Sequence, residues 1–321
     1  MIFKEWPLEE SEGSILAYTI AAGDGNLRKG TALSRDHLDN LRKAGVSHVL
    51  AARLEADDIG EDDAASAIGR ILISSNIETS AATTGRINLF ARSSGMFCAN
   101  IASVDAINML DARVSVASLG NQSRVESGQM VATVKIVPFA IPKALIDEIR
   151  ELSSGSSVFS IHGFQATRIG VIQSRLPSIR ETVLDKTYEL IVKRAVRNGG
   201  SVIAERRVAH ECAALAEAIA ELAGMSDLVV IFSASAVADE ADIVPRSIIQ
   251  AGGEILRIGV PVDPGNLLVL GKCKGKYIVV APGSARSARE NSLDWIIDRL
   301  MAGIELGSAN LARMGVGGLL L

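Results

Sequence analysis

Aromatic residues are scarce in this chain. Phenylalanine, tryptophan and tyrosine make up 4% of its 321 residues, although 48% of the residues are hydrophobic. The core must therefore be built from alanine, valine, isoleucine and leucine, as is common around buried parallel sheets. Cysteine is also rare. The three cysteines are far apart and odd in number, which fits neither a disulfide framework nor a zinc site and favours a reducing cytoplasm.

Two further features are missing. The formal net charge of −4 shows no basic bias, so we expect no nucleic-acid partner. No apolar run is long enough to span a bilayer, and the N-terminus does not have the pattern of a signal peptide. We therefore expect a cytoplasmic protein that does not associate with membranes.

The length is sufficient for two domains of ordinary size. The clearest linker is the serine- and glycine-rich segment 153–157, which predicts an α+β N-terminal domain over residues 1–157 and an α/β domain over residues 158–321. Near the N-terminus, residues 23–26 predict a hairpin turn. From Arg168 onward, strand patterns alternate with helix patterns, which predicts a parallel sheet with helices on both faces.

The most informative stretch runs from residue 225 to residue 299. Its first apolar run, 228–232, predicts a strand buried on both faces. Four small residues, 233–236, follow it and would let backbone N–H groups approach a ligand closely. Next come Asp239, Glu240 and Asp242, and then a predicted helix over 243–250.

Two more predicted strands in this stretch end in Pro-Gly turns. The strand over 255–260 leads to the turn 262–266, and the strand over 277–281 leads to the turn 282–286, which we expect to open a helix carrying Arg289, Glu290 and Asn291. A basic hairpin, 271–276, joins 277–281 to the strand candidate 267–270. Because ligands bind beyond the carboxyl ends of strands in open α/β sheets, this arrangement suits an anionic ligand held with a metal ion.

Each of these signals also has a purely structural interpretation. The acids could cap the next helix, the Pro-Gly turns could be turns only, and Arg286 and Arg289 could form a solvated helix face. His210 is most simply a capping or surface histidine. The functional interpretation depends on all the signals falling at one end of the same predicted sheet.

Several motifs together resemble a known family. They are Ser235-Ala236-Val237, Asp242-Ile243-Val244-Pro245, Pro261 to Leu268, Ala281-Pro282-Gly283 with Ala285-Arg286-Ser287, Asp294-Trp295 and the tail Met314 to Leu319. The chain resembles the molybdopterin-binding (MoCF biosynthesis-like) domain of molybdopterin molybdenumtransferases and adenylyltransferases. It is more similar still to bacterial molybdopterin-binding proteins that are often fused ahead of a nucleotidyltransferase.

The resemblance implies a three-layer, parallel-sheet molybdopterin-binding domain in the C-terminal half and a smaller α+β domain before it. It also implies a set of ligand-binding residues: Ser174, Arg175, Asp185, Ser233, Ser235, Pro264, Gly265, Asn266, Pro282, Gly283, Ser284 and Arg286. Asp239 and Asp242 would hold Mg²⁺ and carry any catalysis. Asp185 has an equal alternative, which is to pair with a lysine on its own helix.

The chain departs from the transferases at the turns. Their Thr-Thr-Gly-Gly-Val-Ser-type turn is 232–236 here, and the lysine of their Pro-Gly-Lys-Pro turn is missing at 264–267. We therefore expect a carrier of molybdopterin, or of its nucleotide form, acting in molybdenum cofactor biosynthesis or delivery as the partner of a separate nucleotidyltransferase. The alternatives are a Mg²⁺-dependent enzyme that transfers a nucleotidyl group or molybdate to molybdopterin, and an unrelated α/β protein. Self-association into a homo-oligomer is left open.

Overall fold

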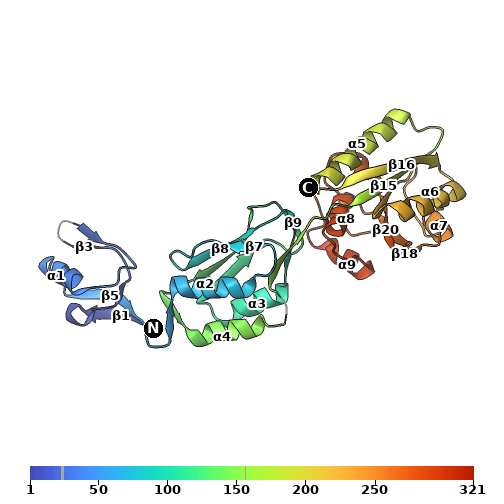
Figure 1. Cartoon of the computed structure of the whole chain (residues 1–321). Helices are drawn as coiled ribbons and strands as arrows, with labels where there is room; N and C mark the ends of the chain where they lie inside the picture. The colour runs from blue at the N-terminus through green and yellow to red at the C-terminus, as the bar shows by residue number, and fades with distance from the viewer. Residues whose placement is uncertain (23–24, 156) are drawn as a thin grey trace. The chain divides into compact units, whose positions relative to one another are not determined.

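The computed structural model describes residues 1–22, 25–155 and 157–321 (Figure 1). Contacts divide the chain into two compact units. Unit 1 contains residues 1–93 and 97–161, and unit 2 contains residues 94–96 and 162–321. The predicted hairpin turn at 23–26 and the predicted linker at 153–157 each include residues outside those described.

Unit 1 is a mixture of short strands and helices. Its strands are β1 (Ile2–Pro7), β2 (Ile15–Leu16), β3 (Ile20–Ala22), β4 (Gly25–Leu27), β5 (His48–Arg53), β6 (Asp58–Gly60), β7 (Ile77–Thr79), β8 (Arg86–Ala91), β10 (Val114–Ser118), β11 (Ser123–Val125), β12 (Met130–Ile136) and β13 (Ala140–Pro142). Its helices are η1 (Leu8–Glu10), α1 (Arg35–Lys43), α2 (Glu61–Leu72), α3 (Ile101–Leu110) and α4 (Lys143–Leu152). Strands β9 (Gly95–Ala99) and β14 (Phe159–Gly163) each include residues of both units.

Unit 1 has two hydrophobic cores. The smaller core gathers around Trp6, Leu16 and Leu41, next to the three-stranded sheet β1-β5-β2. The larger core lies between the sheet β10-β12-β8-β7 and helices α2, α3 and α4, and it includes Phe97 and Phe159. Each sheet therefore buries one face against helices, as layered domains do.

Unit 2 contains one large sheet and the helices that pack on it. Its strands are β15 (Arg168–Arg175), β16 (Ser201–Ala209), β17 (Leu228–Phe232), β18 (Glu254–Ile258), β19 (Val269–Cys273) and β20 (Lys276–Ala281). Its helices are α5 (Glu181–Arg197), α6 (Cys212–Met225), α7 (Ile243–Gln250), η2 (Gly283–Arg286), α8 (Ser292–Met301), α9 (Ser308–Ala312) and η3 (Arg313–Gly315).

The six strands run in the order β16-β15-β17-β20-β19-β18. Strands β16, β15, β17 and β20 are mutually parallel, so their carboxyl ends lie at one edge of the sheet. Strand β19 is antiparallel to both of its neighbours, and the short 274–275 hairpin turns the chain straight back from it into β20. The sheet is therefore mixed, which corrects the prediction of a parallel sheet.

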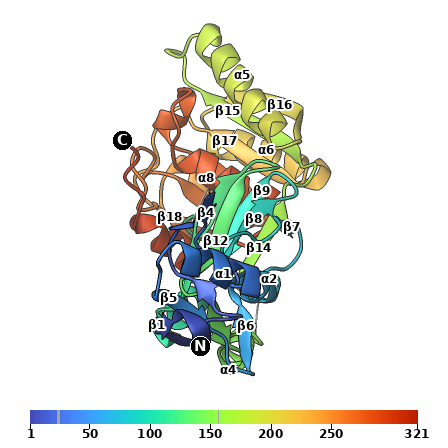
Figure 2. The ribbon, with the colours of Figure 1, turned by 90° about the vertical axis from the view of Figure 1, so that its left-hand side faces the viewer.

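Alternate residues of the central strands face different helices. Val230 and Phe232 pack in the cluster that includes residues of α5 and α8. Val229 and Ile231, between them in sequence, pack with residues of α6 and α7. Figures 1 and 2 show these helices around the sheet. Because side chains alternate across a strand, a run that is buried throughout must be covered on both faces.

Several predicted elements agree closely with the structure. Strand 228–232 and helix 243–250 have the predicted bounds, and the predicted strand 277–281 is β20 from Lys276 onward. The helix predicted to open at residues 282–286 is wrong. Those residues form only the short η2 turn, and α8 begins at Ser292, where the Asn291 side chain accepts the Leu293 N–H. Arg289 and Glu290 therefore precede the helix.

The described chain is thus a mixed α/β protein with several sheets. Among the described residues, no helix combines the length and the apolar character that crossing a lipid bilayer requires.

One prediction concerns the ion pair between Asp227 and Arg168, the first residue of strand β15. Asp227 accepts hydrogen bonds from the Arg168 side chain and from its backbone N–H, and these contacts hold the pKa of Asp227 below its usual value of 3.8. Asp227→Asn should lower the free energy of unfolding at pH 7 by about 0.5–1 kcal/mol, because the pair is partly exposed and screened by solvent.

The sign of the pH effect follows from the lowered pKa. The contribution of Asp227 is complete above the usual aspartate pKa and is lost as the pH falls through the lower native value. Urea denaturation from pH 7 to pH 2 should therefore show the gap between wild type and variant closing on the acid side. A gap that stays constant, or one equal to that of the exposed control Glu217→Gln, would contradict this assignment.

Candidate functional site

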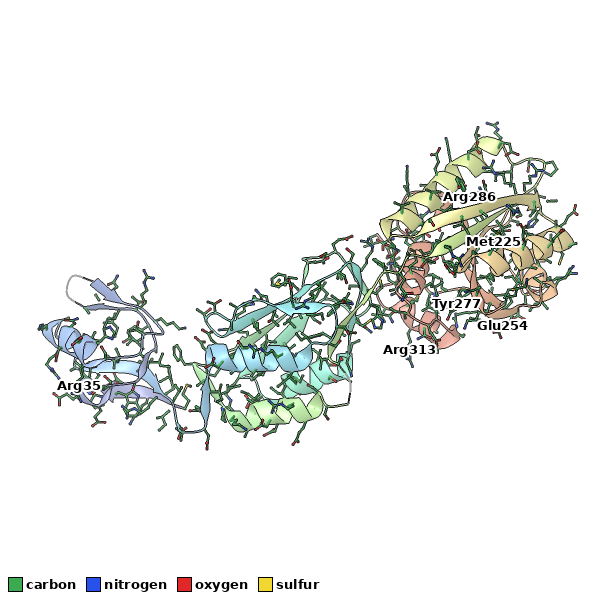
Figure 3. All side chains as sticks on the ribbon, viewed as in Figure 1. Arg35, Met225, Glu254, Tyr277, Arg286 and Arg313 are labelled. Carbon is green, nitrogen blue, oxygen red and sulfur yellow. The ribbon has the colours of Figure 1, made fainter. Side chains whose placement is uncertain are left out.

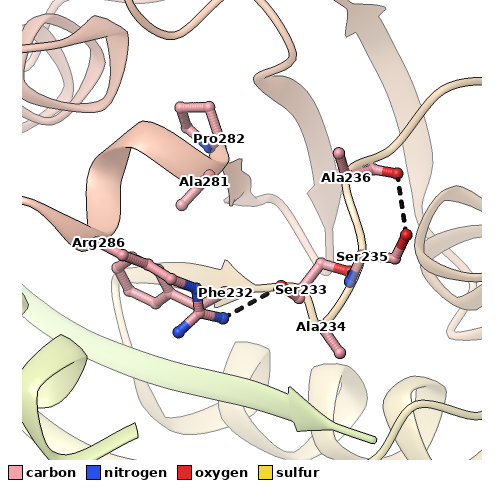
Figure 4. Close-up of a pocket in the computed structure, with 9 residues that line it drawn as sticks. Phe232, Ser233, Ala234, Ser235, Ala236, Ala281, Pro282 and Arg286 are labelled. Atoms are coloured by element: carbon pink, nitrogen blue, oxygen red, sulfur yellow. Dashed lines mark hydrogen bonds between the residues drawn. The ribbon is translucent and has the colours of Figure 1, made fainter. Parts of the chain in front are cut away.

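A small pocket lies at the carboxyl edge of the parallel strands in unit 2. Its volume is about 130 Å³, and the ends of β17 and β20 with the residues that follow them form its walls. The lining residues are Phe232, Ser233, Ala234, Ser235, Ala236, Ala281, Pro282, Gly283 and Arg286 (Figure 4). Pockets for drug-sized ligands measure roughly 300–1,000 Å³, so this one accommodates a group the size of a phosphate rather than a whole large ligand.

Arg286 is the cation of this pocket. Its guanidinium lies 5.7 Å from the centre of the Phe232 ring. The close-up shows the two side chains beside each other (Figure 4). One Nη donates to Thr187 Oγ1 at 2.9 Å, and the other donates to the Ser233 carbonyl at 3.1 Å. Thr187 belongs to helix α5. Arg286 is labelled among the side chains of unit 2 in Figure 3. The side chain is therefore held in place by neutral groups on two different elements.

Arg286 has no acidic partner among the described residues, because none of the ion pairs there involves it. Burial alone lowers the pKa of its guanidinium, with no carboxylate acting in the opposite direction. Arginine nevertheless keeps its proton in proteins. The pocket wall therefore carries a partly desolvated positive charge without a counter-ion, which an anionic ligand would neutralise.

Ser174 fixes the small-residue turn that forms the opposite wall. Its buried hydroxyl accepts the Ala234 N–H at 2.8 Å and lies 2.9 Å from His210 Nδ1. The second contact is a hydrogen bond between the hydroxyl and the histidine ring. Ser174 therefore does not line the pocket but holds the loop that does, and His210 supports Ser174.

A buried arginine fixes the turn that carries Arg286. Arg194 donates to the carbonyls of Ala285 and Ser287, each at 2.9 Å, and pairs with Asp294 at 2.9 Å. Asp294 also accepts the Asn291 N–H at the start of α8. The path of residues 283–287 is therefore set by α5 on one side and by α8 on the other.

The other Pro-Gly turn packs against a helix end. Gly265 adopts φ = +123°, and its carbonyl accepts from the Ser292 hydroxyl at 2.6 Å. A Cβ at Gly265 would lie 2.2 Å from Ser292 Oγ. Pro264 accepts the Ser292 N–H through its carbonyl, and the carbonyl of exposed Asn266 accepts from Val260. These three predicted site residues are outside the lining of the pocket.

The two predicted metal ligands are engaged locally. Asp242 caps α7, with one carboxylate oxygen on the Ile243 N–H and the other on the Ala238 N–H. Asp239 accepts the Ala241 N–H at 2.8 Å. Over residues 1–22, 25–155 and 157–321, no group of three or more metal-ligating side chains gathers. Asp242 directs both oxygens at loop amides and Asp239 directs one, so their contacts are local, and we derive no metal-dependent step.

Two more predicted residues belong to a network of charges between α5 and strands β15 and β16. Asp185 pairs with Arg207 at 2.8 Å, and Arg175 pairs with Glu181 at 3.2 Å. Arg207 also contacts Glu205 and Glu181, and these hydrogen bonds, that to Glu205 first, raise its pKa. Of the two alternatives for Asp185, a ligand contact or a pair with a lysine on its own helix, the structure shows neither, since its ion-pair partner is Arg207 of strand β16.

The structure therefore gathers part of the predicted set. Ser233, Ser235, Pro282, Gly283 and Arg286 line one pocket, and Ser174 supports its wall. The Ser284 hydroxyl is buried next to the pocket without a hydrogen-bond partner among the described residues.

Sequence reasoning missed Phe232 as a pocket wall and Arg194 as the anchor of the turn. Arg194 had one detectable signal. It lies three residues after Ile191 and next to Ala195, so it falls on the apolar face of α5.

Solved structures similar to this chain include proteins of molybdopterin biosynthesis. The molybdopterin biosynthesis MoeA protein from Pyrococcus horikoshii is 13% identical and has a TM-score of 0.33, with 94% of this chain and 75% of that one covered. The molybdopterin biosynthesis enzyme MoaB from Thermus thermophilus is 18% identical, with a TM-score of 0.32 over 43% of this chain and 97% of its own.

A third similar structure is the protein CinA from Thermoplasma acidophilum, whose function is given as unknown. It is 14% identical, with a TM-score of 0.31 over 42% of this chain and 98% of its own. No protein-family model and no curated protein matches the chain. At these TM-scores the likenesses support no functional argument, so the proposal below rests on the residues of this chain.

A pair of glycines tests the structural role of the Pro-Gly turn. Gly265→Ala should lower the free energy of unfolding by about 2 kcal/mol or more, because the new Cβ would overlap Ser292 and strain a positive φ. Gly224→Ala in α6, where a Cβ meets only Lys274 Nζ at 3.9 Å, should be neutral or stabilising. Urea denaturation of both variants checks this, and equal stabilities would contradict the packing described at Ser292.

Proposed function

We propose that the domain predicted over residues 158–321 binds molybdopterin or its nucleotide form, with a phosphate group of the ligand against Arg286. The observation that carries the proposal is the uncompensated guanidinium at the pocket wall. A charge-assisted hydrogen bond from arginine to phosphate is among the strongest polar contacts in proteins. An anion bound here also offsets the cost of burying that cation.

The rest of the pocket is compatible with this ligand class. Gly283 has open space on the side where a Cβ would stand, and the facing turn contains only serine and alanine. A phosphate group can therefore reach the guanidinium without displacing a large side chain. The pterin would extend from the pocket along the carboxyl edge of the sheet, where ligands of open α/β sheets bind.

The local contacts favour a carrier over an enzyme. Asp239 and Asp242, the residues proposed to carry catalysis, are accounted for by amide contacts in their own loop. A carrier needs a preformed pocket and no reactive side chain. We therefore propose a cytoplasmic protein of molybdenum cofactor biosynthesis or delivery that presents its ligand to a separate nucleotidyltransferase.

Removing the guanidinium tests the phosphate contact. Arg286→Ala should weaken binding of molybdopterin by roughly 1.5–3 kcal/mol, because the variant loses a hydrogen bond to a charged group. Fluorescence titration or calorimetry under anaerobic conditions measures this loss. Arg289→Ala is the matched control, since Arg289 is exposed and donates to the Leu320 carbonyl outside the pocket. Equal affinities for wild type and Arg286→Ala would show that the phosphate lies elsewhere.

An assay for product formation distinguishes a carrier from an enzyme. The full chain is incubated with molybdopterin, Mg²⁺ and either ATP, CTP or molybdate, and the products are resolved by chromatography and mass spectrometry. The carrier proposal expects bound, unchanged molybdopterin. Formation of a nucleotide adduct or of a molybdenum-loaded pterin, abolished by Asp242→Asn, would replace the carrier with the enzyme.

A further inference from the structure

The inner face of α5 carries two polar residues within an otherwise apolar interface. Thr187 and Arg194 are 1% and 6% exposed, and they lie seven residues apart, which is about two helical turns. Apolar residues of the same face, Ile191 and Ala195, pack in the sheet cluster that includes Phe232. Buried polar side chains are costly unless they are hydrogen-bonded, so their partners indicate why they are there.

Thr187 holds the guanidinium group of Arg286. Its hydroxyl donates to the Val183 carbonyl at 2.7 Å and accepts from Arg286 Nη1 at 2.9 Å. The donation to the helix directs an oxygen lone pair toward the guanidinium. A valine in this position would keep the shape of the side chain but would remove the acceptor.

Arg194 holds the backbone that carries Arg286. It contacts the carbonyl just before Arg286, that of Ala285, and the carbonyl just after it, that of Ser287. The carboxylate of Asp294, itself 5% exposed, orients the fork of Arg194. Lysine presents a single point of charge and cannot make these contacts together.

We propose that Thr187 and Arg194 are positioning residues of the anion pocket. Through them, helix α5 holds both the guanidinium of Arg286 and the backbone on either side of it, so that the guanidinium is ordered before a phosphate binds. This inference deepens the proposed function and rests on it for the identity of the anion. Neither residue lines the pocket, so each acts through Arg286. Prior ordering favours binding because a free arginine side chain loses rotamer entropy when a ligand fixes it.

A role in folding stability alone makes different predictions. Removing one partner of a buried ion pair such as Arg194–Asp294 destabilises the fold, whether or not the pair positions another residue. A merely structural role would change the stability of the protein and leave the order of the Arg286 side chain and the affinity for phosphate unchanged. The test therefore needs a readout on Arg286 itself.

The first arm needs no ligand. In the full chain, the Nε–Hε resonance of Arg286 is assigned by comparison with Arg286→Lys, and its heteronuclear NOE is measured. We expect a restrained side chain in wild type and in Thr187→Ser, which keeps the hydroxyl, and a mobile one in Thr187→Val and Arg194→Lys. Arg197→Lys is the control, since the described ion pairs of Arg197 are with Asp294 and Asp298 and not with the turn.

The second arm titrates inorganic phosphate into the same proteins. Thr187→Val and Arg194→Lys should weaken binding about three- to tenfold, the effect of losing a single hydrogen bond, and Thr187→Ser and Arg197→Lys should bind as wild type does. In the double variants with Arg286→Lys, the losses should be less than additive because all three residues act on one group.

The two arms separate the possible failures. An Arg286 side chain that stays equally restrained in Thr187→Val and Arg194→Lys overturns the positioning role, whether or not phosphate binds. A side chain that becomes mobile as expected, in a protein whose wild type binds no phosphate, supports the positioning role and overturns the proposed anion site. If Arg194→Lys does not fold, Thr187→Val and Thr187→Ser decide the question alone.

Discussion

The partial burial of one guanidinium, without a carboxylate partner among the described residues, is the constraint on which the site depends. The interior of a protein disfavours an unpaired charge, and buried arginines are usually paired with an acid. Arg194 is paired with Asp294, whereas the contacts of the Arg286 guanidinium within the described chain are a hydroxyl, a carbonyl and an aromatic ring. Such a cation lowers its free energy by acquiring an anion, and the pocket in front of it gives an anion access.

The sheet and two helices together position the residues of this pocket. Parallel strands bring the turns after β17 and β20 to the same edge, because strands of one direction end on one side. Helix α5 then crosses behind the pocket and contacts the turn of Arg286, while α8 begins next to the 264–265 turn. Asp242 of the 239–242 loop caps the start of α7.

The strands and helices around this site were predicted from the sequence more accurately than its side-chain contacts. Strand 228–232 and helix 243–250 were predictable because burial on both faces and an acidic N-cap leave clear local patterns. The start of α8 was missed because the Pro-Gly turn suggested a helix, whereas the Asn291 and Asp294 caps that define the helix lie further on.

The partners of charged residues could not be predicted in this way. Asp185 of α5 pairs with Arg207 of strand β16, and Arg194 pairs with Asp294 a hundred positions later in the chain. Contacts of this range depend on the packing of α5 against its neighbours and leave no local pattern. The same is true of the distinction between Gly283, which faces the pocket, and Gly265, which faces Ser292.

The most direct measurement of the central claim is a crystal structure of the full chain soaked with tungstate, a heavy tetrahedral oxyanion whose anomalous signal locates it without ambiguity. We expect a peak within hydrogen-bond distance of the Arg286 guanidinium, between the 233–236 turn and Gly283. A clear peak at another cation of unit 2, with the Arg286 pocket empty at the same concentration, would contradict it.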